Sequence, residues 1–242
     1  MARRATKTGK TAAKRPTLQQ RVRGVLRWIR RLVLALVMLG LIWIAAYRVL
    51  PVATTPYQIS EARRLGGVSH IWVPMEEISE NLQRAVVAAE DANFCLHWGF
   101  DMDAIRDAID DGGLRGASTI SQQTAKNAFL WQGRSWFRKA MEAVITPTME
   151  AMWPKRRVLE VYLNSVEFAE GVFGAEAAAQ HYFDIPARDL SETQAARLAA
   201  VLPNPQDRSA ADPSDFVIRR ANAIREGAAT IRADGRDDCF AN

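Results

Sequence analysis

Sixteen consecutive residues without a charged side chain, residues 32–47, restrict how this chain folds more than any other feature. A membrane-spanning helix needs about 20 apolar residues, and the flanking Arg31 and Arg48 extend the span because long cations reach the membrane surface. We therefore predict a transmembrane signal anchor at residues 32–50. The aromatic residues that suit the two membrane interfaces are Trp28, Trp43 and Tyr47.

A cleaved signal peptide is the alternative to this anchor. We favour the anchor because the preceding basic region is long and residues 51–56 contain no small-x-small cleavage site. Residues 1–31 hold eleven Lys or Arg and no acid, which predicts a cytoplasmic tail. The chain is thus expected to cross the inner membrane once, with the remainder in the periplasm.

The basic tail also explains the high isoelectric point of the chain. The other residues carry 21 basic and 27 acidic side chains, so the charge does not indicate nucleic-acid binding. We expect residues 51–74, with their prolines, to connect the anchor to a folded domain at residues 75–242. At 48% hydrophobic residues, the chain is able to bury one good-sized core.

The hydrophobic pattern predicts a mainly α domain with one short strand, at residues 70–73. We expect Pro147 to break or kink a helix. In the last helix, the residues expected to face the core are Phe216, Ile218, Ala221, Ile224 and Ile231. The predicted helices are 76–90, 103–110, 118–127, 140–153, 155–166, 175–182, 191–202 and 215–232.

An Ala-rich apolar run ends in two adjacent carboxylates, Glu90 and Asp91, and His97 follows seven residues after Glu90. Such a pair is either a helix cap or a catalytic group. A second stretch, residues 116–127, places a polar stripe on its predicted helix, which suits a sugar or a phosphate. The stripe consists of Ser118, Gln122 and Lys126, with Thr119, Gln123 and Asn127 beside it.

Five blocks in order and spacing resemble the peptidoglycan glycosyltransferases, which polymerise lipid II. The first three are Glu-Asp-x-x-Phe-x-x-His-x-Gly-Phe-Asp from Glu90, Gly-Ala-Ser-Thr-Ile-x-Gln-Gln-x-x-Lys-Asn from Gly116, and Arg-Lys-x-x-Glu from Arg138. Two more lie within residues 155–183 and 190–205, so the resemblance covers roughly residues 70–205. No Ser-x-x-Lys of a penicillin-binding transpeptidase occurs, so we expect a monofunctional enzyme.

The resemblance implies a lysozyme-like, two-lobed helical fold with a cleft. It also implies that Glu90 is the general base and that Lys126 and Arg138 stabilise the leaving pyrophosphate. Glu142 would orient Arg138 or hold a divalent cation, Mg²⁺ or Mn²⁺; a plain i,i+4 salt bridge is the alternative. No cofactor is expected to be obligatory. The substrate-binding set is Asp91, Ser118, Thr119, Gln123, Lys126, Asn127, Arg138, Lys155 and Arg157.

The remaining residues of these blocks have structural expectations. His97 is expected to fix the turn that follows it, and Asp91 to orient Glu90 or a backbone amide. Cys95 and Cys239 either form one disulfide or stay as two thiols, and we favour the disulfide because the predicted compartment is oxidising. Aromatic residues beside cations in residues 128–137 suggest a loop that enters the outer leaflet; ordinary packing under a loop is the alternative.

The expected partners are lipid II and the growing glycan strand, the inner membrane, and cell-division or elongation proteins; no nucleic acid is expected. Two other functions compete with the glycosyltransferase. A hydrolytic relative would cut glycan as lysozymes do, but would not need the cations or the anchor. A non-catalytic envelope scaffold would not need Glu90, Lys126, Arg138 and Glu142 together.

Overall fold

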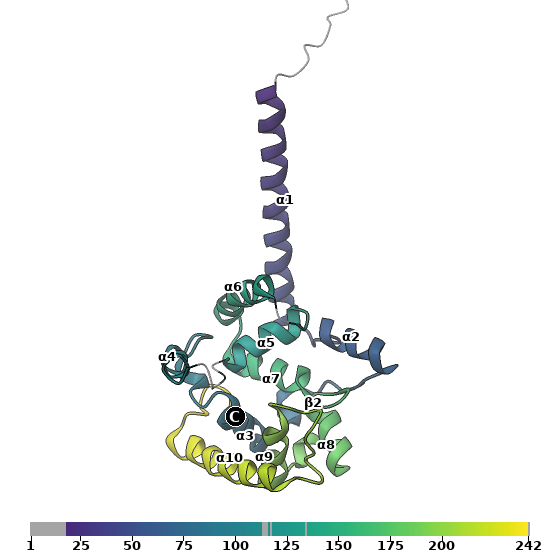
Figure 1. The fold of residues 1–242 in the computed structure, drawn as a ribbon, viewed down its shortest axis with the longest axis vertical. Coiled ribbons are helices and arrows are strands. Elements are labelled where there is room, and N and C mark those ends of the chain that lie inside the picture. Colours follow the sequence, from purple (N-terminus) through teal and green to yellow (C-terminus); the bar gives the residue numbers. More distant parts are fainter. Residues whose placement is uncertain (1–17, 113–115, 117, 134, 242) are drawn as a thin grey trace, which may run out of the picture. The chain divides into compact units, whose positions relative to one another are not determined.

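The computed structural model describes residues 18–112, 116, 118–133 and 135–241 (Figure 1). The chain forms two compact units, Met1–Ala45 and Ala46–Asn242. The prediction of a mainly α chain is confirmed. The described helices longer than one turn are α1 (Leu18–Tyr47), α2 (Pro56–Leu65), α3 (Glu80–Glu90), α4 (Met102–Asp110), α5 (Ile120–Phe129), α6 (Trp136–Met152), α7 (Lys155–Ser165), α8 (Ala175–Phe183), α9 (Glu192–Val201) and α10 (Asp215–Asp234).

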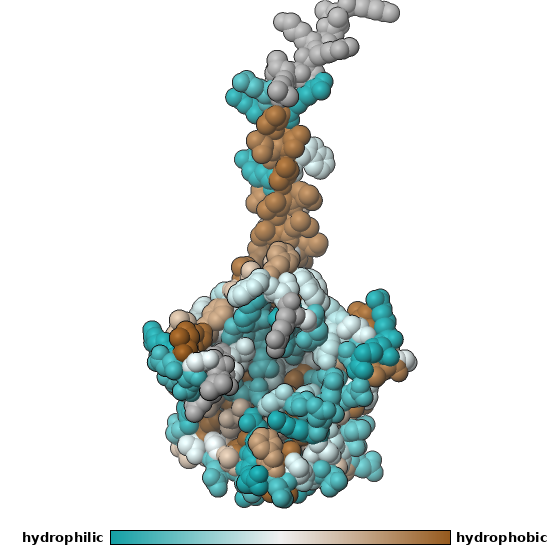
Figure 2. All heavy atoms as spheres, viewed as in Figure 1, coloured by the Kyte–Doolittle hydropathy of each residue, from teal (hydrophilic) through white to brown (hydrophobic). Residues whose placement is uncertain are grey.

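Helix α1 contains a stretch, Arg21–Tyr47, that is long and apolar enough to cross a membrane. Figure 2 shows its apolar side chains along most of its length. Helix α1 includes residues 18–31, so this part of the segment predicted as a cytoplasmic tail is helical; residues 1–17 lie outside the described part. The apolar side chains of Val22, Val25 and Ile29 alternate with arginines, and no Gly-Pro pair or proline interrupts the helix.

The segment expected to connect anchor and domain contributes two elements to the second unit. Thr55 begins α2 with a capping box to Gln58, and Pro56 occupies the first turn. Strand β1 (Ser69–His70) pairs in parallel with β3 (Val172–Phe173), which pairs antiparallel with β2 (Glu167–Ala169). We predicted a strand only at residues 70–73, because strands of two or three residues leave almost no alternation in the sequence.

The helices of the second unit pack in two groups, α3 with α9 and α10, and α5 with α6 and α7 (Figure 1). Helix α3 begins at Glu80, not at Glu76, because Met75–Glu77 form one 3₁₀ turn (η1) and Ser79 caps the helix. The other short 3₁₀ turns are η2 (Phe94–Leu96) and η3 (Ala187–Asp189). Ser191 caps α9 with the capping box that the sequence predicts.

Two further expectations need correction. Helix α6 runs through Pro147 without the expected break, and the alternative, a kink, stays a prediction. The hydroxyl of Thr146 donates to the carbonyl of Glu142, so one carbonyl near the proline gains an extra donor. In α10, Phe216 and Ile218 are exposed and Val217 is buried instead, so the core face begins one residue away from the predicted one.

Candidate active site

Glu90 ends α3 at the boundary between the core and a pocket. The apolar face of α3 places Leu82, Val86 and Val87 in the core, so the last turn emerges from the interior. The side chain of Glu90 is only 14% exposed. It lines a pocket with Asp91, Asn93, Ser118, Thr119 and other residues of the same loops.

Two groups from other helices approach the Glu90 carboxylate. Gln123 of α5 donates from Nε2 to Oε2 at 3.0 Å. Arg220 of α10 lies with Nη2 4.0 Å from Oε1, and its buried Nε has no hydrogen-bond partner among the described residues. Burial raises the pKa of Glu90 above its ordinary value, and the hydrogen bond from Gln123 and the charge of Arg220 oppose that rise. A carboxylate of this kind is suited to accept a proton.

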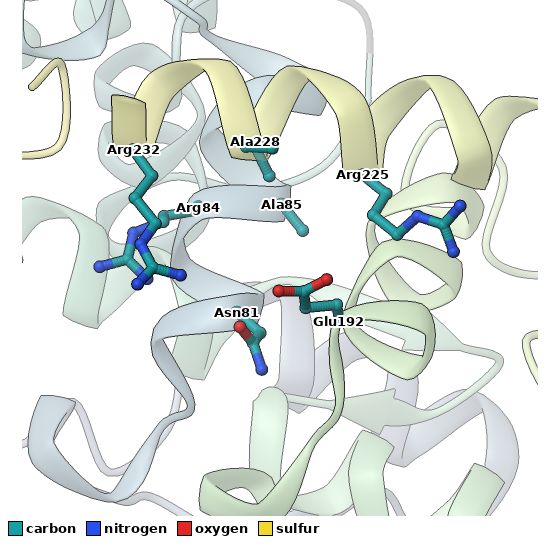
Figure 3. A pocket seen from close by; sticks show the side chains of 8 residues that line it. Asn81, Arg84, Ala85, Glu192, Arg225, Ala228 and Arg232 are labelled. Atoms are coloured by element: carbon teal, nitrogen blue, oxygen red, sulfur yellow. The ribbon is translucent and has the colours of Figure 1, made fainter. Parts of the chain in front are cut away.

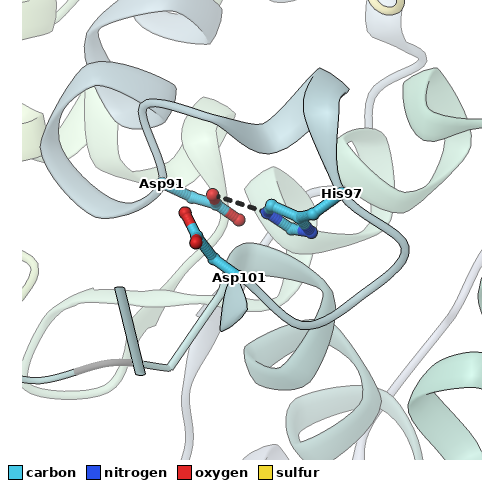
Figure 4. Close-up of side chains that lie close together, drawn as sticks. All are labelled: Asp91, His97 and Asp101. Atoms are coloured by element: carbon cyan, nitrogen blue, oxygen red, sulfur yellow. Dashed lines mark hydrogen bonds and ion pairs between the residues drawn. The ribbon is translucent and has the colours of Figure 1, made fainter. Parts of the chain in front are cut away.

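Asp91 fastens the end of α3 to its surroundings (Figure 4). Its Oδ2 accepts from the backbone N–H of Ile120 at 2.9 Å, and its Oδ1 lies 2.9 Å from Nε2 of His97. The structure thus places Asp91 against a backbone amide and His97 against Asp91. Both contacts hold the loop that follows Glu90 against the start of α5.

Asp91, His97 and Asp101 also bring three potential metal ligands within 4.8 Å of one another. Their oxygens already have donors: Oδ1 of Asp101 caps α4 through two backbone N–H groups, and Oδ2 accepts from Asn93. Both oxygens of Glu142 are likewise bound, by Arg138 and Lys139. In this arrangement the carboxylate oxygens of both groups accept bonds from protein donors.

The polar stretch 118–127 divides into a cap and a helix face. Thr119 and Gln122 form a capping box at the start of α5, so Ser118 lies before the helix rather than on its face. The Thr119 hydroxyl donates to the carbonyl of Gly99 at 2.6 Å. Gly99 has φ +83°, and a Cβ there would lie 2.7 Å from Thr146, so this close approach requires glycine. Asn127 is buried.

A second pocket collects cations around Glu142. Its lining residues are Ser118, Gln122, Gln123, Lys126, Arg138, Lys139 and Glu142. Arg138 pairs with Glu142 at 3.0 Å, one helical turn apart on α6 as the spacing predicts, and Lys139 binds the other oxygen. Lys126 makes no hydrogen bond or ion pair with any described residue; burial lowers its pKa, and Glu142 opposes that change. This pocket suits a multiply charged anion.

Lys155 and Arg157 do not belong to this pocket, so the structure does not support placing them with the substrate. Lys155 binds Glu150 at 2.8 Å and lies over the ring of Phe94. Arg157 donates to the backbone carbonyls of Tyr47 and Leu50. Both are in the first turn of α7, where their side chains meet neighbouring helices instead of the pockets.

Three residues near the pockets were not singled out from the sequence. Tyr162 contacts Gln123, Arg220 faces Glu90, and Lys139 pairs with Glu142. Lys139 lies inside the third block, but the sequence assigns it no role. Tyr162 reads as one of many apolar core residues, and Arg220 as one of several arginines on α10, so no local signal distinguishes them.

The structure joins Cys95 and Cys239 in a disulfide, with their Cα atoms 5.7 Å apart. The bond ties the C-terminal segment to η2, directly after Glu90 and Asp91. Phe94 and Phe240 lie beside it, with ring centroids 6.2 Å apart, and Arg236 donates to the carbonyl of Ala92. The C-terminal segment therefore supports the loop that holds His97.

A further pocket lies between α3, α9 and α10, away from the residues predicted for the site (Figure 3). Figure 3 shows Arg84 and Arg232 close together there, with Glu192 opposite. Arg84 is ion-paired with Asp237 and Glu80.

A family model described as Transglycosylase matches residues 58–229. Three similar proteins are named biosynthetic peptidoglycan transglycosylase. One from Jannaschia sp. is 64% identical over 242 residues, all of both chains. One from Caulobacter vibrioides is 44% identical over 227 residues, 90% of this chain and 99% of its own. One from Pseudomonas fluorescens is 56% identical over 168 residues, 68% of this chain and 70% of its own.

Proposed function

Because this chain belongs to the peptidoglycan transglycosylase family and is a peptidoglycan glycosyltransferase of cell-wall synthesis, we propose that it polymerises lipid II. It would join the GlcNAc 4-hydroxyl of one substrate to the anomeric carbon of MurNAc in another, forming a β-1,4 bond. The observation that carries this proposal is the adjacency of two pockets that share Ser118: one holds the largely buried carboxylate of Glu90 and the other Lys126, which pairs with no described residue.

Glu90 is the general base in this proposal. The acceptor hydroxyl is a weak nucleophile, so a base takes its proton as the new C–O bond forms and the bond to pyrophosphate breaks. Burial raises the pKa of Glu90, which makes its carboxylate a better proton acceptor near neutral pH. Asp91 would serve this step by holding the end of α3 rather than by touching the proton.

Lys126 and Arg138 would receive the leaving polyprenyl diphosphate. The charge of that group grows as the bond to the anomeric carbon breaks, so cations fixed beforehand stabilise the transition state. Support comes from Lys126, which has no partner among the described residues, and from Arg138, which Glu142 and the carbonyl of Gly133 hold in place. In this proposal Glu142 holds the cationic side chains in position. Lys126, Arg138 and Glu142 need no metal ion for this arrangement. Ser118, Thr119 and Gln123 are proposed for substrate binding because they line the two pockets, whereas Asn127 is proposed on its motif position alone, since it is buried and lines neither pocket.

The membrane is the second part of the proposal. Helix α1 would span the inner membrane with its N-terminus in the cytoplasm and the catalytic unit outside. Trp131, Trp136 and Phe137 are exposed, Trp136 at 92%, and would contact the lipid of membrane and substrate. In residues 46–242, replacing Trp131 and Trp136 with Ser should weaken liposome binding about tenfold, whereas Phe216→Ser on α10 should not. Equal liposome binding by all three proteins would contradict the contact.

The test of the reaction is polymerisation of labelled lipid II in detergent by the wild type and by Glu90→Gln. We expect linear polymer from the wild type and a loss of about 10²–10⁴-fold in the variant. Release of fragments from glycan instead of polymer would support a hydrolase. Polymer at equal rates from both proteins would leave the reaction intact and remove Glu90 as the base.

A further inference from the structure

The hydroxyl of Tyr162 on α7 is a buried polar group that needs a partner. The residue is fully buried, with 0% of its surface exposed. Its hydroxyl lies 3.3 Å from Oε1 of Gln123, and no other hydrogen bond to this hydroxyl is present among the described residues. A buried hydroxyl without a partner is costly, so this contact is strongly favoured.

Tyr162 is held as a hydrogen-bond donor. Burial raises its pKa well above the ordinary value, and the negative charges of Glu90 and Asp91 raise it further. The phenol therefore keeps its proton, and that proton points to an acceptor. Of the two ends of the Gln123 amide, only the carbonyl oxygen accepts a hydrogen bond.

This contact fixes which end of Gln123 faces Glu90. With Oε1 bound to Tyr162, the amide nitrogen Nε2 points to Oε2 of Glu90 at 3.0 Å. In the flipped amide, a carbonyl oxygen would face the carboxylate, and the buried phenol proton would lose its acceptor. Both changes are unfavourable, so the three groups have one preferred arrangement.

We infer that Tyr162 is a positioning residue for the base: it locks the amide of Gln123 so that this amide donates to Glu90. The inference rests on the proposed role of Glu90 and adds a residue that does not touch the substrate. A hydrogen bond to the ionised form stabilises that form and so limits the rise that burial causes in the pKa of Glu90. The other charged groups that act on Glu90 are Asp91 of the same turn, Lys126 of α5 and Arg220 of α10.

The test compares Tyr162→Phe with Tyr57→Phe. Phenylalanine keeps the buried ring and removes one hydroxyl. Tyr57 of α2 also loses one hydrogen bond, to Glu167 at 2.6 Å, and it lies on a helix that contributes nothing to either pocket. The full-length chain in detergent is assayed with lipid II from pH 5 to 9, and its thermal unfolding is recorded.

We expect Tyr162→Phe to move the acid limb of kcat/KM upward by about one pH unit, because one unit corresponds to one weak hydrogen bond to a charged group. The rate then falls about tenfold at the acid end and much less at the alkaline end. Tyr57→Phe should lower thermal stability and leave the pH profile unchanged. An acid limb that does not move in a folded, active Tyr162→Phe would overturn the inference.

A second variant, Gln123→Met, tests the inference even if Tyr162→Phe does not fold. Gln123→Met should move the acid limb at least as far, and the double variant should move it no further than Gln123→Met alone, because Tyr162 acts on Glu90 only through the Gln123 amide. If Tyr162→Phe does not fold, an unmoved acid limb in Gln123→Met overturns the inference by itself.

A carboxyl ¹³C titration of glutamate-labelled protein separates this inference from the proposed function. The Glu90 resonance is assigned by its absence in Glu90→Gln. Its midpoint should rise in Tyr162→Phe and not in Tyr57→Phe, whether or not the protein polymerises lipid II. Polymerisation by the wild type without such a rise would remove only Tyr162. A rise without polymer from the wild type would remove only the proposed reaction.

Discussion

Glu90 on α3 and Glu142 on α6 are both largely buried carboxylates beside α5, and their surroundings differ in charge. Glu142 has a cation on each oxygen, Arg138 and Lys139. Glu90 has one neutral amide donor and a guanidinium 4.0 Å away. Glu142 therefore serves as the counter-ion of two cations, whereas burial raises the pKa of Glu90. This difference supports Glu90 as the group that takes the proton and Glu142 as the group that positions the cations.

Removing the disulfide should have the largest effect, and it should act on the surroundings of Glu90 rather than on those of Glu142. Cys95 and Cys239 support the loop after Glu90, whereas Glu142 is held on α6 by Arg138 and Lys139. A disulfide that closes a long loop contributes about 2–5 kcal/mol, so replacing both cysteines with Ala should lower the Tm by roughly 10 °C. Hydrogen exchange should show amides of residues 91–97 losing protection and those of α6 keeping theirs. Equal loss on both would show that the two regions are not independent.

Removing the charge of Glu142 should destabilise the protein. Glu142→Gln leaves Arg138 and Lys139 without their counter-ion beside the buried Lys126. Breaking a buried pair costs about 3–5 kcal/mol, and because Lys139 is nearly half exposed we expect about 2 kcal/mol and a Tm lower by roughly 4–8 °C. Thermal unfolding at pH 7 measures this change. A Tm equal to that of the wild type would mean that Glu142 does not organise these cations.

Removing the charge of Glu90 should instead stabilise the protein at neutral pH. Its folded pKa is raised, so its contribution to stability is fully present below the unfolded value of 4.5 and is lost as pH rises through the folded pKa. Glu90→Gln should therefore raise the Tm at pH 7 or above, by about 2–4 °C, and give no gain at pH 4. Thermal unfolding over that pH range is the measurement. A lower Tm at neutral pH would mean that the surroundings of Glu90 stabilise its ionised form.

Of these changes, replacing Arg220 should have the smallest effect. Its charge opposes the raised pKa of Glu90, so Arg220→Met should raise that pKa further and move the acid limb of the rate upward. We expect about half a unit, because the side chain is about one-third exposed and solvent screens it. Arg219→Met, an exposed neighbour on the same helix, is the matched control. Identical pH profiles for both variants would exclude Arg220 from the environment of Glu90.

The sequence predicted those parts of the site that depend on local spacing. The turn that separates Arg138 from Glu142 on α6, the Ser191 capping box and the apolar run before Glu90 are all short-range patterns, and each is present. It did not predict which way the side chains of α7 point. Lys155 and Arg157 are the right residue types for a phosphate, but Lys155 lies over Phe94 and Arg157 binds Tyr47, both on segments distant in the sequence.

Contacts between helices that are distant in the sequence determine the features that the sequence did not predict. Whether Arg220 is a solvated cation or a neighbour of Glu90 depends on how α10 packs against α3, and the sequence of α10 does not encode it. The same packing buries Val217 and exposes Phe216 and Ile218, although all three are apolar. Ser118 and Thr119 look like part of a helix face because a capping box and a helix use the same residue types.

The most direct measurement is the pH dependence of kcat/KM for lipid II polymerisation by the wild type, Glu90→Gln and Glu142→Gln under one set of conditions. We predict that Glu90→Gln loses about 10²–10⁴-fold and also loses the acid limb. Glu142→Gln should be slower than the wild type and keep an acid limb. An acid limb that persists unchanged in Glu90→Gln and disappears in Glu142→Gln would reverse the two assignments.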